Sequence, residues 1–144
     1  MNHLEGSKTV AKISTSVAAN ATHSHEIDTY GHDYLSVDVV FSPFTAATTS
    51  YASVLKLQQS DASGSGQVDI SGLSVTSAGA GSTTGATIGA VARFNLDCRA
   101  IKRYVTVVAT PGNTVAVATA ARLGKSEDMP YNAKTAGVND FVSG

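Results

Sequence analysis

The sequence predicts an all-β fold, a single-domain antiparallel β-sandwich of jelly-roll type, on three observations. Thr, Ser, Val, Ala and Gly dominate the 144 residues, whereas Glu, Leu and Lys, which are typical of amphipathic helices, are scarce. Several segments alternate apolar and polar residues with a period of two, as half-buried strands do. Gly, Pro, Asn and Ser separate these segments, and no amphipathic segment of helical length lies between them.

Seven segments have the composition of strands. The clearest alternation lies in residues 34–41, where each odd-numbered residue is apolar and the intervening Ser36 and Asp38 point to the other face. The pattern in residues 67–75 changes phase around Ser71 and Gly72, which indicates a β-bulge. The expected strands are 9–17, 34–41, 51–59, 67–75, 87–95, 100–109 and 114–123.

The last of these segments is also the nearest candidate for a helix, because 114–123 is rich in alanine and is followed by Gly124. Its residues alternate, however, between a larger and a smaller set. We therefore expect an inner strand with both faces buried where two sheets approach closely. Pro111, Gly112 and Asn113 are expected to form the turn of a hairpin that joins it to the preceding strand.

The chain divides into three parts: an N-terminal arm with a possible edge strand (1–21), the β-sandwich core (22–124) and a C-terminal tail (125–144). Within the core, residues 77–85 have no side chain that could anchor them and are expected to form a flexible surface loop. The tail loses the strand pattern but keeps more large apolar residues than a spacer needs, so we expect it to dock on a neighbouring molecule. Those residues are Met129, Tyr131, Val138 and Phe141.

Composition narrows the function classes. Ten basic and eleven acidic residues give a net charge of -1, which disfavours nucleic acid as a partner. No apolar run approaches the roughly 20 residues that span a bilayer, so we expect a soluble chain made in the cytoplasm, with no membrane partner. Cys98 has no second cysteine to pair with and is expected to be a small core residue; a reactive thiol beside Arg99 is the alternative.

Candidate chemistry is sparse, and we expect no catalytic residue, no metal site, no cofactor and no enzymatic activity. His23, His25 and Glu26 could ligate a metal, but without further ligands at suitable spacing a solvated loop is the better interpretation. His32 and Asp33 could belong to a hydrolytic triad, but no Gly-x-Ser-x-Gly motif accompanies them. The glycine-rich segment 79–89 lacks the Gly-Lys-Ser/Thr ending of a phosphate-binding loop.

Arg99, Lys102 and Arg103 form a basic cluster. Strand alternation would send Arg99 and Arg103 to one face and Lys102 to the other, so the patch is weak. We expect it to pair with carboxylates of a neighbouring subunit rather than with phosphates.

Four short motifs carry a resemblance to a known family. They are Ile27-Asp-Thr-Tyr-Gly-His-Asp-Tyr34, Leu57-Gln-Gln-Ser-Asp61, Lys102-Arg-Tyr-Val105, and Ala121-Arg-Leu-Gly124 followed by Pro130. In this order and spacing the chain resembles the small all-β virion proteins of tailed bacteriophages that decorate or cement the head. The resemblance covers about residues 27–130, and the chain departs from the family in its N-terminal arm and its tail.

The resemblance implies a structural protein of the virion that is made in the host cytoplasm, binds the major capsid protein on the outer capsid surface and stabilises the head. It also implies a homotrimer. The four tail residues named above are the expected capsid or subunit contacts on a separate ground: large apolar side chains are unfavourable on a permanently solvated segment. Self-association would cover apolar surface that we expect at Val39, Phe41, Tyr104 and Val108.

Two alternatives remain. One is a structural component of the phage tail or neck. The other is a carbohydrate- or ligand-binding β module, for which a chain with no Trp, 5 Tyr and 4 Phe is poorly equipped.

Overall fold

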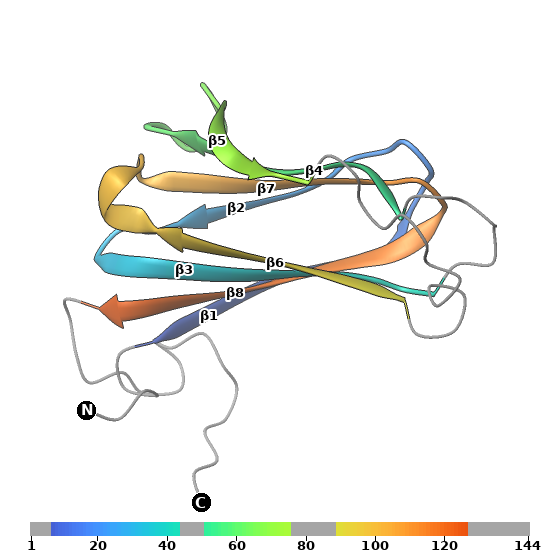
Figure 1. The fold of residues 1–144 in the computed structure, drawn as a ribbon, viewed down its shortest axis with the longest axis horizontal. Helices are drawn as coiled ribbons and strands as arrows, with labels where there is room; N and C mark the ends of the chain where they lie inside the picture. The colour runs from blue at the N-terminus through green and yellow to red at the C-terminus, as the bar shows by residue number, and fades with distance from the viewer. Residues whose placement is uncertain (1–6, 44–50, 76–88, 127–144) are drawn as a thin grey trace, which may run out of the picture.

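The computed structural model describes residues 7–43, 51–75 and 89–126, which form a sandwich of two four-stranded antiparallel sheets (Figure 1). A short 3-10 turn, η1 (Cys98–Ala100), follows the sixth strand. The strands are β1 (Lys8–Val17), β2 (His23–Asp28), β3 (His32–Phe41), β4 (Ala52–Ser60), β5 (Val68–Ser74), β6 (Ala90–Asp97), β7 (Tyr104–Pro111) and β8 (Val115–Ser126).

The strand order is that of a jelly roll. One sheet, called sheet A, has the order β1-β8-β3-β6, and the other, sheet B, has the order β2-β7-β4-β5. Every connection crosses from one sheet to the other except that between β4 and β5, which are neighbours in sheet B. Eight strands in two such sheets are the double Greek key of a jelly roll. The predicted all-β sandwich is thus confirmed.

The core lies between the sheets and is built by the predicted alternation. Leu35, Val37, Val39 and Phe41 of β3 are each at most 2% exposed. Opposite them, β4 and β7 of sheet B contribute further aliphatic side chains. The largest fully buried residues are Phe41, Ile27, Leu35, Leu55, Leu57 and Leu123. Burial of this set stabilises the fold by roughly 1.5–3 kcal/mol per large side chain.

Two local features follow from glycines. Gly72 has a φ of 81° and lies in β5 where the pairing with β4 shifts register, which confirms the expected bulge. Gly89 has a φ of 74° and precedes β6, and a Cβ atom there would clash with the carbonyl of Phe41. Only glycine lets β6 start so close to the end of β3.

Three sequence-based expectations about strands are wrong. The segment that holds His23, His25 and Glu26 was expected to be a solvated loop, but it lies in strand β2, residues 23–28. Pro111 ends β7 in sheet B while β8 belongs to sheet A, so Gly112 and Asn113 lie in a connection between sheets, not in a hairpin turn. Only one face of β8 is buried: Ala121 lies in the core, whereas on the opposite face Ala120 is exposed and Ala118 is half-buried.

Other expectations lie outside the described residues. They concern the loop 77–85 and the contact residues Met129, Tyr131, Val138 and Phe141. Only the start of the expected tail is described, and there Lys125 and Ser126 complete β8.

Candidate functional surface

The His23 and His25 side chains lie between the sheets, where edge strands β1 and β2 meet. His23 is 2% exposed and His25 9%. His23 Nδ1 is 2.8 Å from the Ser14 hydroxyl, and His25 Nδ1 is 2.7 Å from the Thr119 hydroxyl. His23 Nε2 lies 3.3 Å from the same Thr119 oxygen. These contacts, called the histidine seam, close one edge of the sandwich.

One proton arrangement satisfies the whole seam. The Ser14 hydroxyl donates to His23 Nδ1, and His23 Nε2–H and His25 Nδ1–H both donate to Thr119 Oγ1. The Thr119 hydroxyl in turn donates to the carbonyl of Lys12 at 3.4 Å. Both imidazoles are neutral in this arrangement.

Electrostatics agree with neutral imidazoles. Burial lowers the pKa of His23, with a further contribution from the Lys12 charge. The pKa of His25 is lowered by burial, then by His23 and by Lys12. Within the described ranges no group of three or more His, Cys, Asp and Glu side chains could hold a metal ion. The seam therefore acts as a buried polar joint and not as a solvated loop.

The other candidate side chains have ordinary structural roles. His32 Nδ1 is 3.0 Å from the carbonyl of Tyr30, and the carboxylate of Asp33 pairs with Lys125 at 2.9 Å, so the two do not form a dyad. Cys98 is buried, and burial, with smaller effects of Asp97 and Asp33, raises the pKa of its thiol to about 11. The prediction of a core cysteine is confirmed.

The basic cluster is neutralised within the chain. Arg99 pairs with Asp97 at 2.5 Å and lowers the pKa of that carboxyl to about 2. Lys102 and Arg103 form similar pairs, to the carboxylates of Asp61 and Asp28 at 2.5 Å and 2.7 Å. Each of the three side chains thus has a carboxylate partner within its own chain, and pairing with a neighbouring subunit stays a prediction.

The outer face of sheet A, which points away from the core, carries exposed apolar side chains in a line. Ile13 is 70% exposed, Val91 64% and Val40 39%. Strand register places them side by side with Ala118 across all four strands. From one edge of the sheet to the other, this apolar row consists of Ile13, Ala118, Val40 and Val91.

The next rows of the same face become polar step by step. The adjacent row holds Ala11 and Ala120 on one half and the ion pair of Asp38 and Arg93, 2.6 Å apart, on the other. We call it the mixed row. The row beyond it, the polar row, consists of Thr9, Arg122, Ser36 and Asn95.

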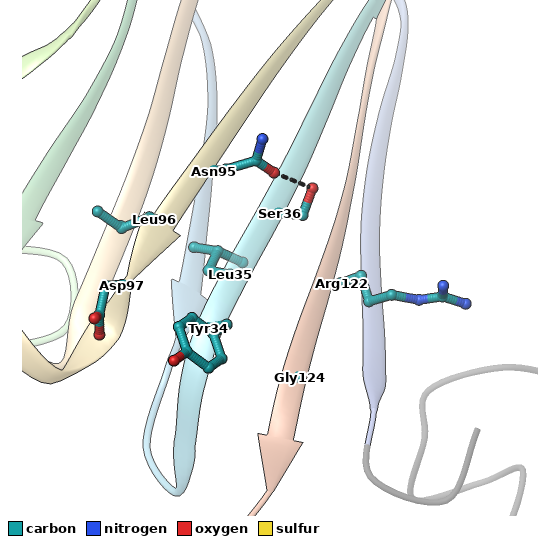
Figure 2. Close-up of a pocket in the computed structure, with 8 residues that line it drawn as sticks. All are labelled: Tyr34, Leu35, Ser36, Asn95, Leu96, Asp97, Arg122 and Gly124. Atoms are coloured by element: carbon teal, nitrogen blue, oxygen red, sulfur yellow. Dashed lines mark hydrogen bonds between the residues drawn. The ribbon is translucent and has the colours of Figure 1, made fainter. Parts of the chain in front are cut away.

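Shallow hollows lie over the polar part of this face. One, of about 440 Å³, is lined by residues that include Tyr34, Ser36, Asn95 and Asp97; Figure 2 shows the Ser36 hydroxyl bonded to Asn95, and the Arg122 side chain extending away from Tyr34. A second hollow, of about 350 Å³, shares Ser36 and Arg122 with it. Both are too open to enclose a small molecule.

The exposed tyrosines are engaged by cations. The guanidinium of Arg99 lies 5.3 Å from the Tyr34 ring centroid, and the ammonium of Lys125 lies 5.9 Å from it. The Arg103 guanidinium is 4.9 Å from the ring of Tyr30. These rings are therefore not bare platforms for stacking.

Sequence reasoning missed this outer face. The apolar surface was expected at Val39 and Phe41, but both are buried in the core. The signal present in the sequence was an apolar residue out of phase with its strand, such as Val40 between Val39 and Phe41. Register across four strands was needed to bring such residues into one row.

The comparisons with known proteins identify no family. No family model matches the chain, and no curated protein matches it. The described residues also include no helix able to cross a membrane. Among solved structures, PRD1 vertex protein P5 is similar with 9% identity and a TM-score of 0.46, covering 86% of this chain and 99% of that one. A chain of the Bacillus endospore appendages, "a novel family of disulfide-linked pili", is similar with 11% identity and a TM-score of 0.40, covering 88% and 93%.

Proposed function

We propose that this chain is a structural protein of a virion, which binds the outer capsid lattice and stabilises the head as a decoration or cement protein. The motif resemblance in residues 27–130 suggests this role. The observation that carries the proposal is a jelly roll whose apolar row on the outer face of sheet A is exposed, while the histidine seam and Cys98 are buried and structural.

The mechanism requires binding and no catalysis. A protein that binds the assembled shell but not its separated subunits stabilises the shell by its binding free energy. Many copies act on one particle, so modest affinity at each site adds up to a large effect on the whole shell. A rigid sandwich suits this task because little conformational entropy is lost when it binds.

The alternative of a carbohydrate-binding module has less support. Sugar recognition uses aromatic faces, and the rings of Tyr30 and Tyr34 each have a cation over them. No aromatic ring within the described ranges is both exposed and free of such a contact.

The test is binding to purified empty heads that lack this protein. We expect the chain to sediment with the heads at a fixed copy number per particle and to raise their melting temperature. The matched control is bovine serum albumin at the same concentration, which should remain in the supernatant. Failure to sediment with heads at any concentration tested would contradict the proposal.

A truncation after Ser126 separates the tail from the folded domain. If Met129, Tyr131, Val138 and Phe141 provide the attachment, the truncated chain keeps its β-type circular dichroism but loses binding to heads. Because β8 ends at Ser126, the truncation removes no described strand residue. Unchanged binding would refute attachment through the tail and assign it to the N-terminal arm or to the sheet face.

A further inference from the structure

The outer face of sheet A is complementary to itself. In the mixed row, small side chains occupy β1 and β8, and the Asp38–Arg93 ion pair occupies β3 and β6. The small side chains of one half of the row can therefore accommodate the large side chains of the other half. A second copy of the face, rotated by 180°, brings these two halves opposite each other.

A two-fold axis parallel to the strands, midway between β8 and β3, performs that turn. It lays β1 of one copy on β6 of the other and β8 on β3, and it keeps each row opposite the same row. The Asp38–Arg93 pair of each copy then covers Ala11 and Ala120 of the other. Sheets stack in this aligned manner at about 10 Å separation, with interdigitating side chains.

The same rotation matches the two flanking rows. In the apolar row, Ile13 meets Val91 of the second copy, and Ala118 meets Val40, so exposed aliphatic groups leave water together. In the polar row, the long Arg122 side chain lies opposite the short Ser36 of the second copy. The apolar row therefore pairs apolar side chains with each other, and the mixed and polar rows pair larger side chains with smaller ones.

The size and charge of the face also suit a second copy. Four strands at ~4.8 Å spacing and the eight residues of β6 at ~3.3 Å rise span roughly 500 Å². Two such faces bury roughly 1,000 Å², the lower bound for a specific interface. The net charge of -1 adds little repulsion between copies.

We propose that two copies of this chain associate face to face through the outer surfaces of sheet A, as a two-fold symmetric dimer. A self-complementary patch gives an isologous dimer, whereas a three-fold ring needs two different patches on each copy. The inference thus differs from the trimer that the resemblance implies, and it holds whether or not the chain belongs to a virion.

The test is sedimentation equilibrium of the purified full chain with charge substitutions at two points of contact. Ile13 and Val91 are exposed, so Ile13→Glu and Val91→Lys should fold normally. Each should weaken the dimer by about tenfold or more, because a charge then lies against an apolar side chain. Val68→Glu, at a 49% exposed residue of β5 in sheet B, is the matched control and should leave association unchanged.

The double variant Ile13→Glu/Val91→Lys tests the geometry itself. In one copy these positions lie at opposite edges of the row, three strand spacings or ~14 Å apart, too far to pair. Across the two-fold axis they are opposite each other, so the double variant should recover dimerisation. A wild-type chain that stays monomeric at millimolar concentration, a trimeric mass, or a double variant as weak as the single ones would each overturn the inference. Loss of head binding by Ile13→Glu in a monomeric chain would instead assign the face to the shell.

Discussion

The outer faces of the two sheets differ in what covers them. On sheet B, the turn after β4 reaches across β7 to β2, where the Glu26 carboxylate accepts hydrogen bonds from the Ser63 hydroxyl (2.5 Å) and the Gly64 N–H (2.7 Å). Thr106 of β7, paired with Glu26 on one side and with Gln58 of β4 on the other, is 5% exposed. On sheet A, Ala120 at the centre of β8 is exposed, and the apolar row lies beside it.

The difference shows that, among the described residues, a turn of the chain covers part of the outer face of sheet B, whereas the apolar row of sheet A stays exposed. Figure 1 shows β5 beside β4, at the edge of sheet B. Within the described ranges no segment covers the apolar row, since Ile13 and Val91 are both more than half exposed. An exposed apolar row on a flat sheet is what a partner surface requires.

A charge placed on the outer face of each sheet should have unequal effects on stability. Thr106→Asp puts a carboxylate under the turn and next to Glu26, so we expect a loss of roughly 3 kcal/mol or more in the free energy of unfolding. Ala120→Asp at the exposed position of sheet A should cost about 0.5–1 kcal/mol. Urea denaturation of both variants measures the difference, and equal losses would show that the two faces are covered alike.

The next largest effect concerns the joint between the sheets. Thr119→Val removes the hydroxyl that accepts from both His23 and His25, and it leaves two buried ring N–H groups unpaired. We expect a loss of about 2–3 kcal/mol. Thr110→Val loses one hydroxyl contact, to Thr22 at 3.2 Å, and is the matched control with a loss of about 1 kcal/mol. A smaller loss for Thr119→Val than for the control would refute the seam's role.

Acid should open the same joint. Because burial lowers the pKa of His23 and His25 below 6.5, the folded state binds fewer protons than the unfolded state. The stability that the two neutral imidazoles contribute is therefore fully present above about pH 6.5, and it is lost as the pH falls from there through the folded pKa values. Urea midpoints between pH 8 and pH 5 measure this, with His25→Gln as the variant whose slope should be shallower. A stability that rises toward pH 5 would contradict neutral imidazoles.

How far the sequence predicts the molecule depends on which contacts decide each feature. Period-two alternation predicts β3 and its buried residues Leu35 to Phe41, because one strand against one core is a local pattern. The histidine seam escaped prediction because histidine is a polar residue that is usually exposed. Its burial is favourable here only because Ser14 of the neighbouring strand β1 and Thr119, 94 residues away from His25, supply hydroxyl partners. The apolar row escaped for a related reason: its four residues come from four strands, and their registers are not visible in the chain.

A smaller effect is expected from detaching the turn that covers sheet B. Glu26→Ala removes the acceptor of the Ser63 hydroxyl and the Gly64 N–H, at a cost of about 1–2 kcal/mol. Glu26→Gln keeps one acceptor oxygen and should cost less. Hydrogen exchange at the Gly64 amide should accelerate in the alanine variant, while exchange in the central strand β8 stays slow. Unchanged exchange at Gly64 would mean that other contacts hold the turn.

The smallest effect, and one of opposite sign, is expected at Thr106 itself. Its hydroxyl is buried beneath the turn and has no hydrogen-bond partner among the described residues, so folding removes it from water without compensation. Thr106→Val keeps the shape and the β-branched side chain but removes that unpaired group, and it should raise the free energy of unfolding by about 0.5–1 kcal/mol. The three threonines then form a series measured by urea denaturation: Thr119→Val loses most, Thr110→Val loses little and Thr106→Val gains. A loss at Thr106 comparable to that at Thr110 would show that its hydroxyl is hydrogen-bonded in solution, through water that enters beneath the turn, and that sheet B is covered less tightly than its 5% exposure implies.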